Sequence, residues 1–256
     1  MIYKRMAANL RAQNWLAIGI ELGIVIVGVF IGTQVSNWNA QRLEKRETQR
    51  MLAQLKPNLQ TLTDYFSTAR TYYGTTRRYA TTALAGWRGD GSVSDRNFVV
   101  AAYQASQITG IGTNSSSWAT VLGADQLRRI DDPATRSELS LLMSSDYSNL
   151  DIGAVNTPYR QNVRRLIPVE MQEAIRDQCG DRPTPGKALF TFLPPTCDLK
   201  IAPDQATKAA AILRAHPELS LDLQWHLAAQ AALLANIPAF ETTTINLLRR
   251  IAALPK

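Results

Sequence analysis

The sequence predicts an all-α protein, in which one N-terminal transmembrane helix continues into the long first helix of a periplasmic helical bundle. An apolar run at 15–35 is long enough to cross a bilayer as a helix. Apolar residues then recur at spacings of three and four from Leu52 to Thr76. Beyond them, prolines and capping residues divide the chain into segments of helical length, and no run alternates in the manner of strands.

The composition limits the classes of partner. The 256 residues leave some 220 after the apolar run, enough for a domain with its own core. The net charge of +7 comes from scattered basic residues rather than from a stripe, so we expect no nucleic-acid partner. A mild basic excess suits anionic lipid headgroups, or simply a solvated surface.

We expect the apolar run to remain attached as an anchor at 15–36, behind a cytoplasmic tail at 1–14. A cleaved signal is shorter and ends in small residues, whereas this run ends in Gln34-Val35-Ser36-Asn37. Basic residues occur on both sides of it and barely favour one orientation. They are Lys4, Arg5 and Arg11 before the run, and Arg42, Lys45, Arg46 and Arg50 after it.

Two cysteines help to decide the orientation. Cys179 and Cys197 enclose a segment rich in proline and glycine, which we expect to have little secondary structure of its own. A disulfide across it would stabilise the fold by about 3 kcal/mol on the loop-closure model. Such a pair indicates an oxidising compartment, although two unrelated buried thiols are an alternative. We therefore predict a bacterial inner-membrane protein with a cytoplasmic N-terminus and a periplasmic C-terminal domain.

The anchor carries residues typical of contacts between membrane helices. Glu21, Gly28 and Gly32 share one helical face, and Gly19 and Gly23 lie nearly opposite. Such small-residue pairs let two helices approach closely, which predicts self-association or contact with another membrane protein. For Glu21 the hypotheses are an interhelical hydrogen bond, a side chain that snorkels to the interface, and a proton or ion relay.

Trp15 and Trp38 flank the anchor, where indole rings favour the lipid interface. We expect a membrane-proximal helix at 37–86, kinked near Pro57 because proline removes a backbone donor. Its heptad seam predicts either an intramolecular bundle, which is the default, or a coiled coil between protomers. The seam comprises Leu52, Leu55, Leu59, Leu62, Phe66, Ala69 and Tyr73.

The remaining segment, 87–256, is predicted to be a helical domain that contains the cysteine loop. After a break near Gly86 and a cap at Ser94 or Asp95, we expect helices at 96–108, 118–122, 125–130, 134–150 and 158–176, the last interrupted at Pro168. A loop is expected at 109–117. Three further helices are expected at 202–215, 217–235 and 238–254. The second carries an apolar stripe formed by Leu219, Leu223, His226, Leu227 and Leu234.

The runs QVSNWNAQR and SSSWATVLGADQLRRIDDPATRSELSLL resemble an uncharacterised family of bacterial single-pass membrane proteins. Such proteins combine an apolar anchor, an N-W-N exit and an all-helical domain of unknown function. The resemblance covers about the first 150 residues. It implies the anchored architecture and brings no activity, cofactor or site residues with it.

The sequence contains no recognisable catalytic or metal-binding motif. His216 and His226 lie ten residues apart without further ligands, and His226 is expected to be packed or half-exposed. The serines at 115–117 match no nucleophile motif, and of the adjacent Asp131 and Asp132 the second is a helix cap. We therefore expect no cofactor and no enzymatic activity.

These observations predict a structural or interaction protein, a subunit or accessory component of a membrane-protein assembly. Its partners would be the lipid bilayer and other membrane proteins, or a second copy of the chain. The alternative is a periplasmic ligand-sensing module that signals through a partner, because a tail of about 14 residues is too short for an output domain.

Overall fold

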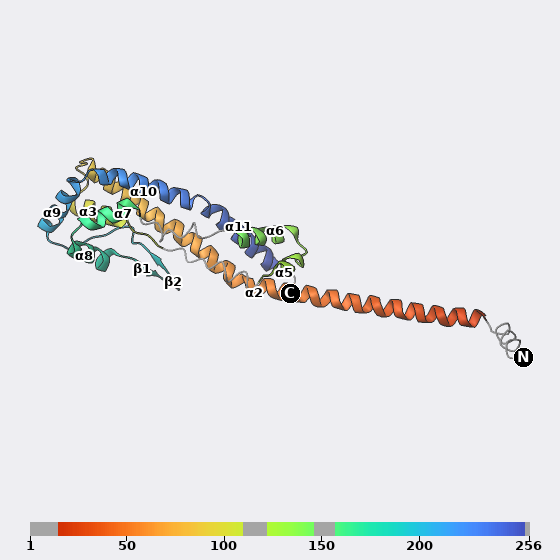
Figure 1. Cartoon of the computed structure of the whole chain (residues 1–256). Helices are drawn as coiled ribbons and strands as arrows, with labels where there is room; N and C mark the ends of the chain where they lie inside the picture. The colour runs from red at the N-terminus through yellow and green to blue at the C-terminus, as the bar shows by residue number, and fades with distance from the viewer. Residues whose placement is uncertain (1–14, 110–121, 146–156, 254–256) are drawn as a thin grey trace, which may run out of the picture. The chain divides into compact units, whose positions relative to one another are not determined.

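In the computed structural model of the protein, the described residues are 15–109, 122–145 and 157–253 (Figure 1). The predicted all-α class is confirmed, since helices dominate and the described strands are two short ones. The elements are α2 (Trp15–Trp87), α3 (Asp95–Ala105), α5 (Ala124–Arg128), α6 (Pro133–Ser144), α7 (Pro158–Leu166), α8 (Val169–Cys179), β1 (Arg182–Thr184), β2 (Lys187–Phe192), α9 (Pro203–Arg214), α10 (Glu218–Leu234) and α11 (Ile237–Ala253).

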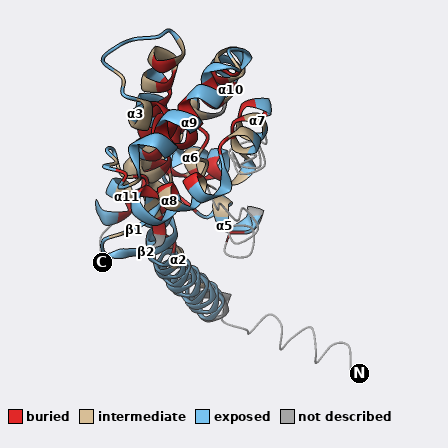
Figure 2. Cartoon of the chain, turned by 90° about the vertical axis from the view of Figure 1, so that its left-hand side faces the viewer, coloured by how far each residue is buried: buried red, intermediate tan, exposed pale blue. Residues whose placement is uncertain are grey.

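The chain forms two compact units, Met1–Met51 and Leu52–Lys256. In the first, α2 is long and apolar enough to cross a membrane, and none of its apolar segment is buried. Figure 2 shows this part of the helix in the colour of exposed residues. A core helix of comparable composition would be mostly buried, so the apolar surface of α2 has no protein covering within the described chain.

In the second unit, the heptad seam of α2 faces the interior. All seven seam side chains are buried, from Leu52 to Tyr73. The C-terminal helix α11 packs against this face, where the Phe66 and Phe240 rings stack with centroids 5.8 Å apart. One turn away, the Thr63 hydroxyl donates to the Thr244 hydroxyl over 2.9 Å. The seam therefore packs inside its own chain, and Figure 1 shows α10 and α11 alongside this part of α2.

Pro57 lies inside α2, and the helix continues through it. Proline removes one backbone donor, which leaves the carbonyl of Ala53 without its helical partner. Both residues lie on the exposed side of α2, so water can bond that carbonyl. The Thr61 hydroxyl donates to the Pro57 carbonyl over 3.0 Å on the same side. Proline at this position thus does not require the helix to restart.

The far end of α2 is joined closely to α3 and α9. The Trp87 indole N–H donates to the Leu213 carbonyl over 2.9 Å, and its ring meets the edge of Phe98 with centroids 5.0 Å apart. A Cβ atom added to Gly86 would lie 2.1 Å from Phe98 Cδ2. Glycine is needed here because no larger residue leaves room for that ring.

Capping explains where most of the shorter helices begin. The Ser94, Asp132 and Thr157 side chains each accept a backbone N–H at the start of α3, α6 and α7, and a proline follows in the last two. Pro168 separates α7 from α8, which are two helices rather than one interrupted helix. The helices pack in pairs, α3 on α9, α7 on α10 and α6 on α11.

Two helices end at least three residues earlier than predicted from the sequence. The helix expected to reach 108 ends at Ala105, because Ser106 turns back onto the Tyr103 and Gln104 carbonyls. The helix expected to reach 150 ends at Ser144, where Ser145 is extended. The loop expected at 109–117 lies almost wholly outside the described residues, as does most of the helix expected at 118–122.

The expectation of little secondary structure between the cysteines was wrong. β1 and β2 form an antiparallel hairpin within the loop, with Arg182 opposite Phe192. Gly186 supplies the positive φ of +73° at its turn, a conformation that favours glycine. Contacts with α2 hold the hairpin in place. The Phe190 ring packs on Tyr65 with centroids 4.6 Å apart, and Lys187 Nζ lies 2.7 Å from Asp64 Oδ1.

The buried seam generates a stability prediction. We expect Leu59→Ala to lower the free energy of unfolding by about 2–5 kcal/mol, because a fully buried leucine leaves a cavity. The matched change Leu221→Ala on α10, where the side chain is 65% exposed, should cost less than about 0.5 kcal/mol. Denaturant unfolding monitored by tryptophan fluorescence measures both. Equal effects would contradict the intramolecular packing of the seam.

Candidate functional site

The apolar segment of α2, which is predicted to be the anchor, has no contact partner within the described chain. At Gly19, Gly23, Gly28 and Gly32, nothing lies within 4 Å of an added Cβ, and the Glu21 side chain is exposed. The faces named in the sequence analysis are thus open to another helix, and their contact with one stays a prediction. Trp15 is the first residue of α2.

Trp38 follows the apolar run on the same helix. Its side chain is exposed, and the Arg42 guanidinium lies over the indole ring at 4.6 Å from the centroid. A cation on an aromatic face is favourable and leaves the remaining guanidinium N–H groups free to meet polar groups. This pairing suits an interfacial position, which stays a prediction.

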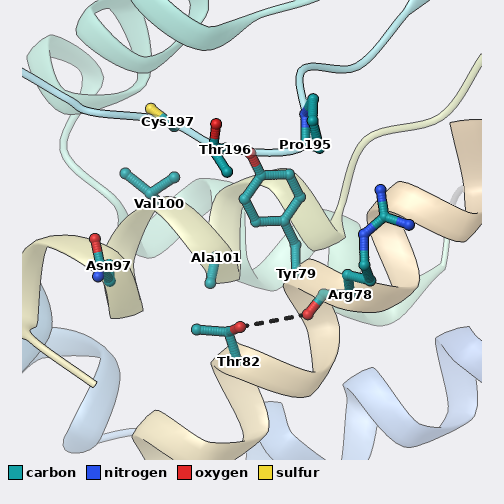
Figure 3. A pocket seen from close by; sticks show the side chains of 9 residues that line it. All are labelled: Arg78, Tyr79, Thr82, Asn97, Val100, Ala101, Pro195, Thr196 and Cys197. Carbon is teal, nitrogen blue, oxygen red and sulfur yellow. Dashed lines mark hydrogen bonds between the residues drawn. The ribbon is translucent and has the colours of Figure 1, made fainter. Parts of the chain in front are cut away.

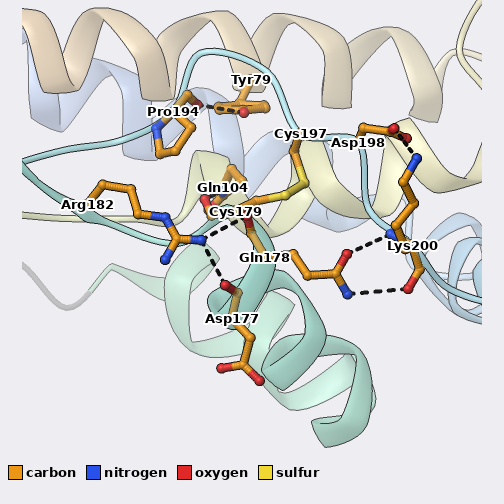
Figure 4. The surroundings of a disulfide bond; sticks show 10 residues. All are labelled: Tyr79, Gln104, Asp177, Gln178, Cys179, Arg182, Pro194, Cys197, Asp198 and Lys200. Atoms are coloured by element: carbon orange, nitrogen blue, oxygen red, sulfur yellow. Dashed lines mark hydrogen bonds and ion pairs between the residues drawn. A yellow bond between two sulfur atoms is a disulfide. The ribbon is translucent and has the colours of Figure 1, made fainter.

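The structure contains the predicted disulfide between Cys179 and Cys197 (Figure 4). Cys179 is the last residue of α8, and its carbonyl accepts a hydrogen bond of 2.6 Å from the buried Gln104 amide. On the other side, the Gln178 side chain accepts from the backbone N–H of Lys200 over 2.7 Å. The bridge therefore joins α8 to the segment that leads into α9.

A hollow of about 290 Å³ lies beside this disulfide (Figure 3). Across it the Tyr79 hydroxyl donates to the Pro194 carbonyl over 2.8 Å, and burial raises the pKa of Tyr79 to about 12. Among the described residues of the lining, Arg78 supplies the one charged side chain, and none carries a carboxylate or an imidazole. Such a lining suits binding rather than acid–base chemistry. The lining residues are Arg78, Tyr79, Thr82, Asn97, Val100, Ala101, Pro195, Thr196 and Cys197.

Three guanidinium groups gather at the C-terminal end of α3. We call Arg160, Arg164 and Arg176, together with Tyr103 and Ser106, the arginine cluster. Arg160 Nη1 donates to the Ser106 carbonyl over 2.5 Å, and Arg164 Nε donates to the Ser106 hydroxyl over 3.0 Å. Arg164 also stacks on the Tyr103 ring at 4.8 Å, while Arg176 Nη1 lies 3.4 Å from the Tyr103 hydroxyl.

Asp181 lies near this cluster. Its carboxylate accepts a hydrogen bond of 2.8 Å from the Tyr72 hydroxyl. Burial raises the pKa of Asp181, and the Tyr72 bond and the charges of Arg164 and Arg160 oppose that rise. Burial is also the main cause that lowers the pKa of Arg160 and Arg164. For Arg160, the second cause is repulsion from the positive charge of Arg164. The site thus contains more positive than negative charge in partly desolvated surroundings.

His226 on α10 is fully buried beside the cluster's helix α7. Its Nδ1 lies 2.6 Å from the Thr157 hydroxyl and its Nε2 lies 2.8 Å from Gln230 Nε2. Burial is the main cause that lowers the pKa of His226 to about 4. A neutral ring suits this pair of partners, since one nitrogen donates and the other accepts. His226 therefore joins α7 to α10 as a structural residue.

Comparisons with family models, curated proteins and solved structures find no match. The resemblance to a family of anchored helical proteins thus stays a prediction.

Two of the other residues considered for chemistry have a capping or a surface role in the described part of the chain. Asp132 caps α6, and His216 pairs with Glu218 at the surface over 2.7 Å. Among the described residues, no group of three His, Cys, Asp or Glu side chains could hold a metal ion. The serines at 115–117 lie outside the described residues.

The sequence analysis missed the arginine cluster. In the sequence, the basic residues are scattered over the chain. The available signal was the spacing of Arg160 and Arg164, which places both on one face of α7, next to the buried Tyr159 and Val163. Their meeting with Ser106 and Arg176 depends on the packing of α7 and α8 against α3.

The disulfide generates a second prediction. Replacing Cys179 and Cys197 by serine should lower the free energy of unfolding by about 3 kcal/mol. Without the bridge, the unfolded chain regains the conformational entropy that closing a loop between residues 18 apart removes. Denaturant unfolding of oxidised wild type and variant measures this difference. Added reductant should lower the stability of the wild type and leave the variant unchanged. A variant as stable as the oxidised protein would contradict a stabilising bridge.

His226 generates a pH prediction. The pKa of His226 is near 6.5 in the unfolded chain and about 4 in the folded chain. Between these pH values the unfolded state therefore binds one more proton than the folded state. Stability should therefore fall as the pH falls below 6.5, by roughly 2 kcal/mol at pH 5 relative to pH 7.5. Urea unfolding at both values measures it. In His226→Gln this part of the pH dependence should disappear, and its persistence would assign it to other groups.

Proposed function

We propose that this protein is a single-pass membrane protein with a structural or interaction role, a subunit or accessory component of an assembly in a bacterial inner membrane. One observation carries the proposal. The apolar segment of α2 is unburied, whereas the same helix from Leu52 onward is lined by a buried seam. Large apolar side chains exposed on every face suit hydrocarbon and are unfavourable in water.

The compartment of the domain is supported by the disulfide. Bridges of this kind form and persist in oxidising environments such as the periplasm. Because α2 would cross the membrane once, the residues that precede it would then lie in the cytoplasm. This orientation leaves the helical domain to meet its partners outside the cytosol.

The role in assembly is supported by the anchor's small residues. Gly28 and Gly32 share a face with Glu21, and Gly19 and Gly23 form a second small-residue pair. Close approach of helices, together with a hydrogen bond from Glu21, would hold a second anchor or a neighbouring membrane protein.

A second candidate function is ligand sensing, and the arginine cluster favours it. Excess positive charge in partly buried surroundings is a common feature of sites for anionic ligands. Signalling would then pass through a partner that the anchor or the domain contacts.

The orientation is tested with reporters fused to the C-terminus in a Gram-negative host. We expect an alkaline phosphatase fusion to be active and a green fluorescent protein fusion exported through the Sec pathway to be dark, because the first requires the periplasm and the second folds in the cytosol. The fusion protein should sediment with membranes and resist carbonate extraction. The reverse reporter pattern would contradict the periplasmic placement, and a soluble fusion would contradict the anchor.

The helix contact is tested by cross-linking the full chain in membranes. Gly28→Leu with Gly32→Leu should reduce cross-linked species several-fold, because bulky side chains keep helix backbones apart. Val29→Leu, about 80° around the helix from Glu21, is the matched control and should have little effect. An unchanged pattern in the double variant would contradict the proposed contact face.

A further inference from the structure

We propose that the arginine cluster binds an oxyanion, the phosphate or carboxylate group of a small ligand, between the guanidinium groups of Arg160, Arg164 and Arg176. This inference concerns the helical domain alone and does not depend on the membrane assignment.

Shared contacts bring the three guanidinium groups to one place. Arg160 and Arg164 both donate to Ser106, one to its carbonyl and one to its hydroxyl. Arg164 and Arg176 both contact Tyr103, one on the ring face and one at the hydroxyl. Because Tyr103 and Ser106 lie one helical turn apart, the three groups surround the last turn of α3.

The positive charge of this group is incompletely balanced by the protein. Among the described residues, no carboxylate oxygen lies within 4 Å of Arg160 or Arg164, and Arg176 reaches Glu173 at 3.9 Å. The carboxylate of Asp181 interacts with Arg160 and Arg164 only over a longer distance, and it accepts a hydrogen bond from the Tyr72 hydroxyl. Charges removed from water without a counter-charge are unfavourable, and arginine is well suited to bind phosphate and carboxylate oxygens.

Capping of α3 explains part of the arrangement but leaves donors unused. The Ser106 carbonyl at the helix end accepts from Arg160, and the partial negative charge of a helix C-terminus offsets about half of one positive charge. Arg164 Nη2 donates a second hydrogen bond, 2.7 Å long, to the neutral Gln107 amide oxygen. Arg160 Nε and Nη2 and Arg164 Nη1 have no acceptor among the described residues and are not sealed from solvent.

The surroundings hold the donors in place and leave an approach from solvent. Stacking on Tyr103 and two hydrogen bonds fix the plane of the Arg164 guanidinium, so little side-chain freedom is lost on binding. The Arg176 side chain is 47% exposed, so solvent reaches the cluster at this residue. Asp181 and Glu173 are carboxylates that would oppose an anion, and Asp181 is already engaged by the Tyr72 hydroxyl at 2.8 Å.

The test is thermal unfolding of the full chain in detergent, with sodium phosphate, sodium succinate or sodium chloride at equal ionic strength. We expect phosphate, succinate or both to raise the Tm saturably relative to chloride. For a dissociation constant of about 1 mM, the rise at 10 mM is roughly 3–6 °C. The arm that responds identifies a phosphate or a carboxylate as the bound group. Equal Tm values in all three salts would overturn the proposal.

Variants separate binding from capping. Arg164→Gln should abolish the anion-dependent rise, whereas Arg165→Gln, an exposed neighbour on α7, should retain it. If Arg164 only caps α3, its variant loses basal stability but keeps the same rise, which overturns the proposal. Arg176→Gln serves if Arg164→Gln does not fold, because Arg176 is exposed. It should raise the apparent dissociation constant about tenfold, and an unchanged constant would overturn the proposal.

Discussion

The packing of the α2 seam against the rest of the second unit is the constraint on which the domain depends. The seam side chains from Leu52 to Tyr73 are buried, and Phe66 and Thr63 fix α11 along the same face. At the end of this helix, Gly86 packs against α3 and Trp87 donates a hydrogen bond to α9. The remaining helices pack on these neighbours, so α2 is the central helix around which the core is built.

One helix therefore presents two kinds of surface. From Ile20 to Val35 its large apolar side chains are exposed on all sides, whereas from Leu52 onward the helix carries a stripe of apolar side chains that is buried. A helix that is apolar all round belongs in lipid or in the centre of a large core, and a striped one belongs at the edge of a bundle. The apolar segment of α2 and its striped segment thus differ in the spacing of their apolar residues.

The sequence predicts features that depend on neighbouring residues and misses features that depend on distant ones. Asp132 with Pro133, and Thr157 with Pro158, mark helix starts through local hydrogen bonds. The hairpin at 182–192 was missed because its prolines and glycine indicate a loop, whereas Tyr65 and Asp64 on α2 hold it as strands. The arginine cluster was missed for the same reason, since Ser106 meets Arg160 and Arg164 only through helix packing.

The close approach of Phe98 to Gly86 has a consequence for natural variation of this chain. The ring occupies the space that any side chain at position 86 would need. In homologous sequences, a larger residue at 86 should therefore be accompanied by a smaller one at 98, and a glycine at 86 by an aromatic ring. This paired change would be recorded in an alignment as covariation between the end of α2 and the first turn of α3.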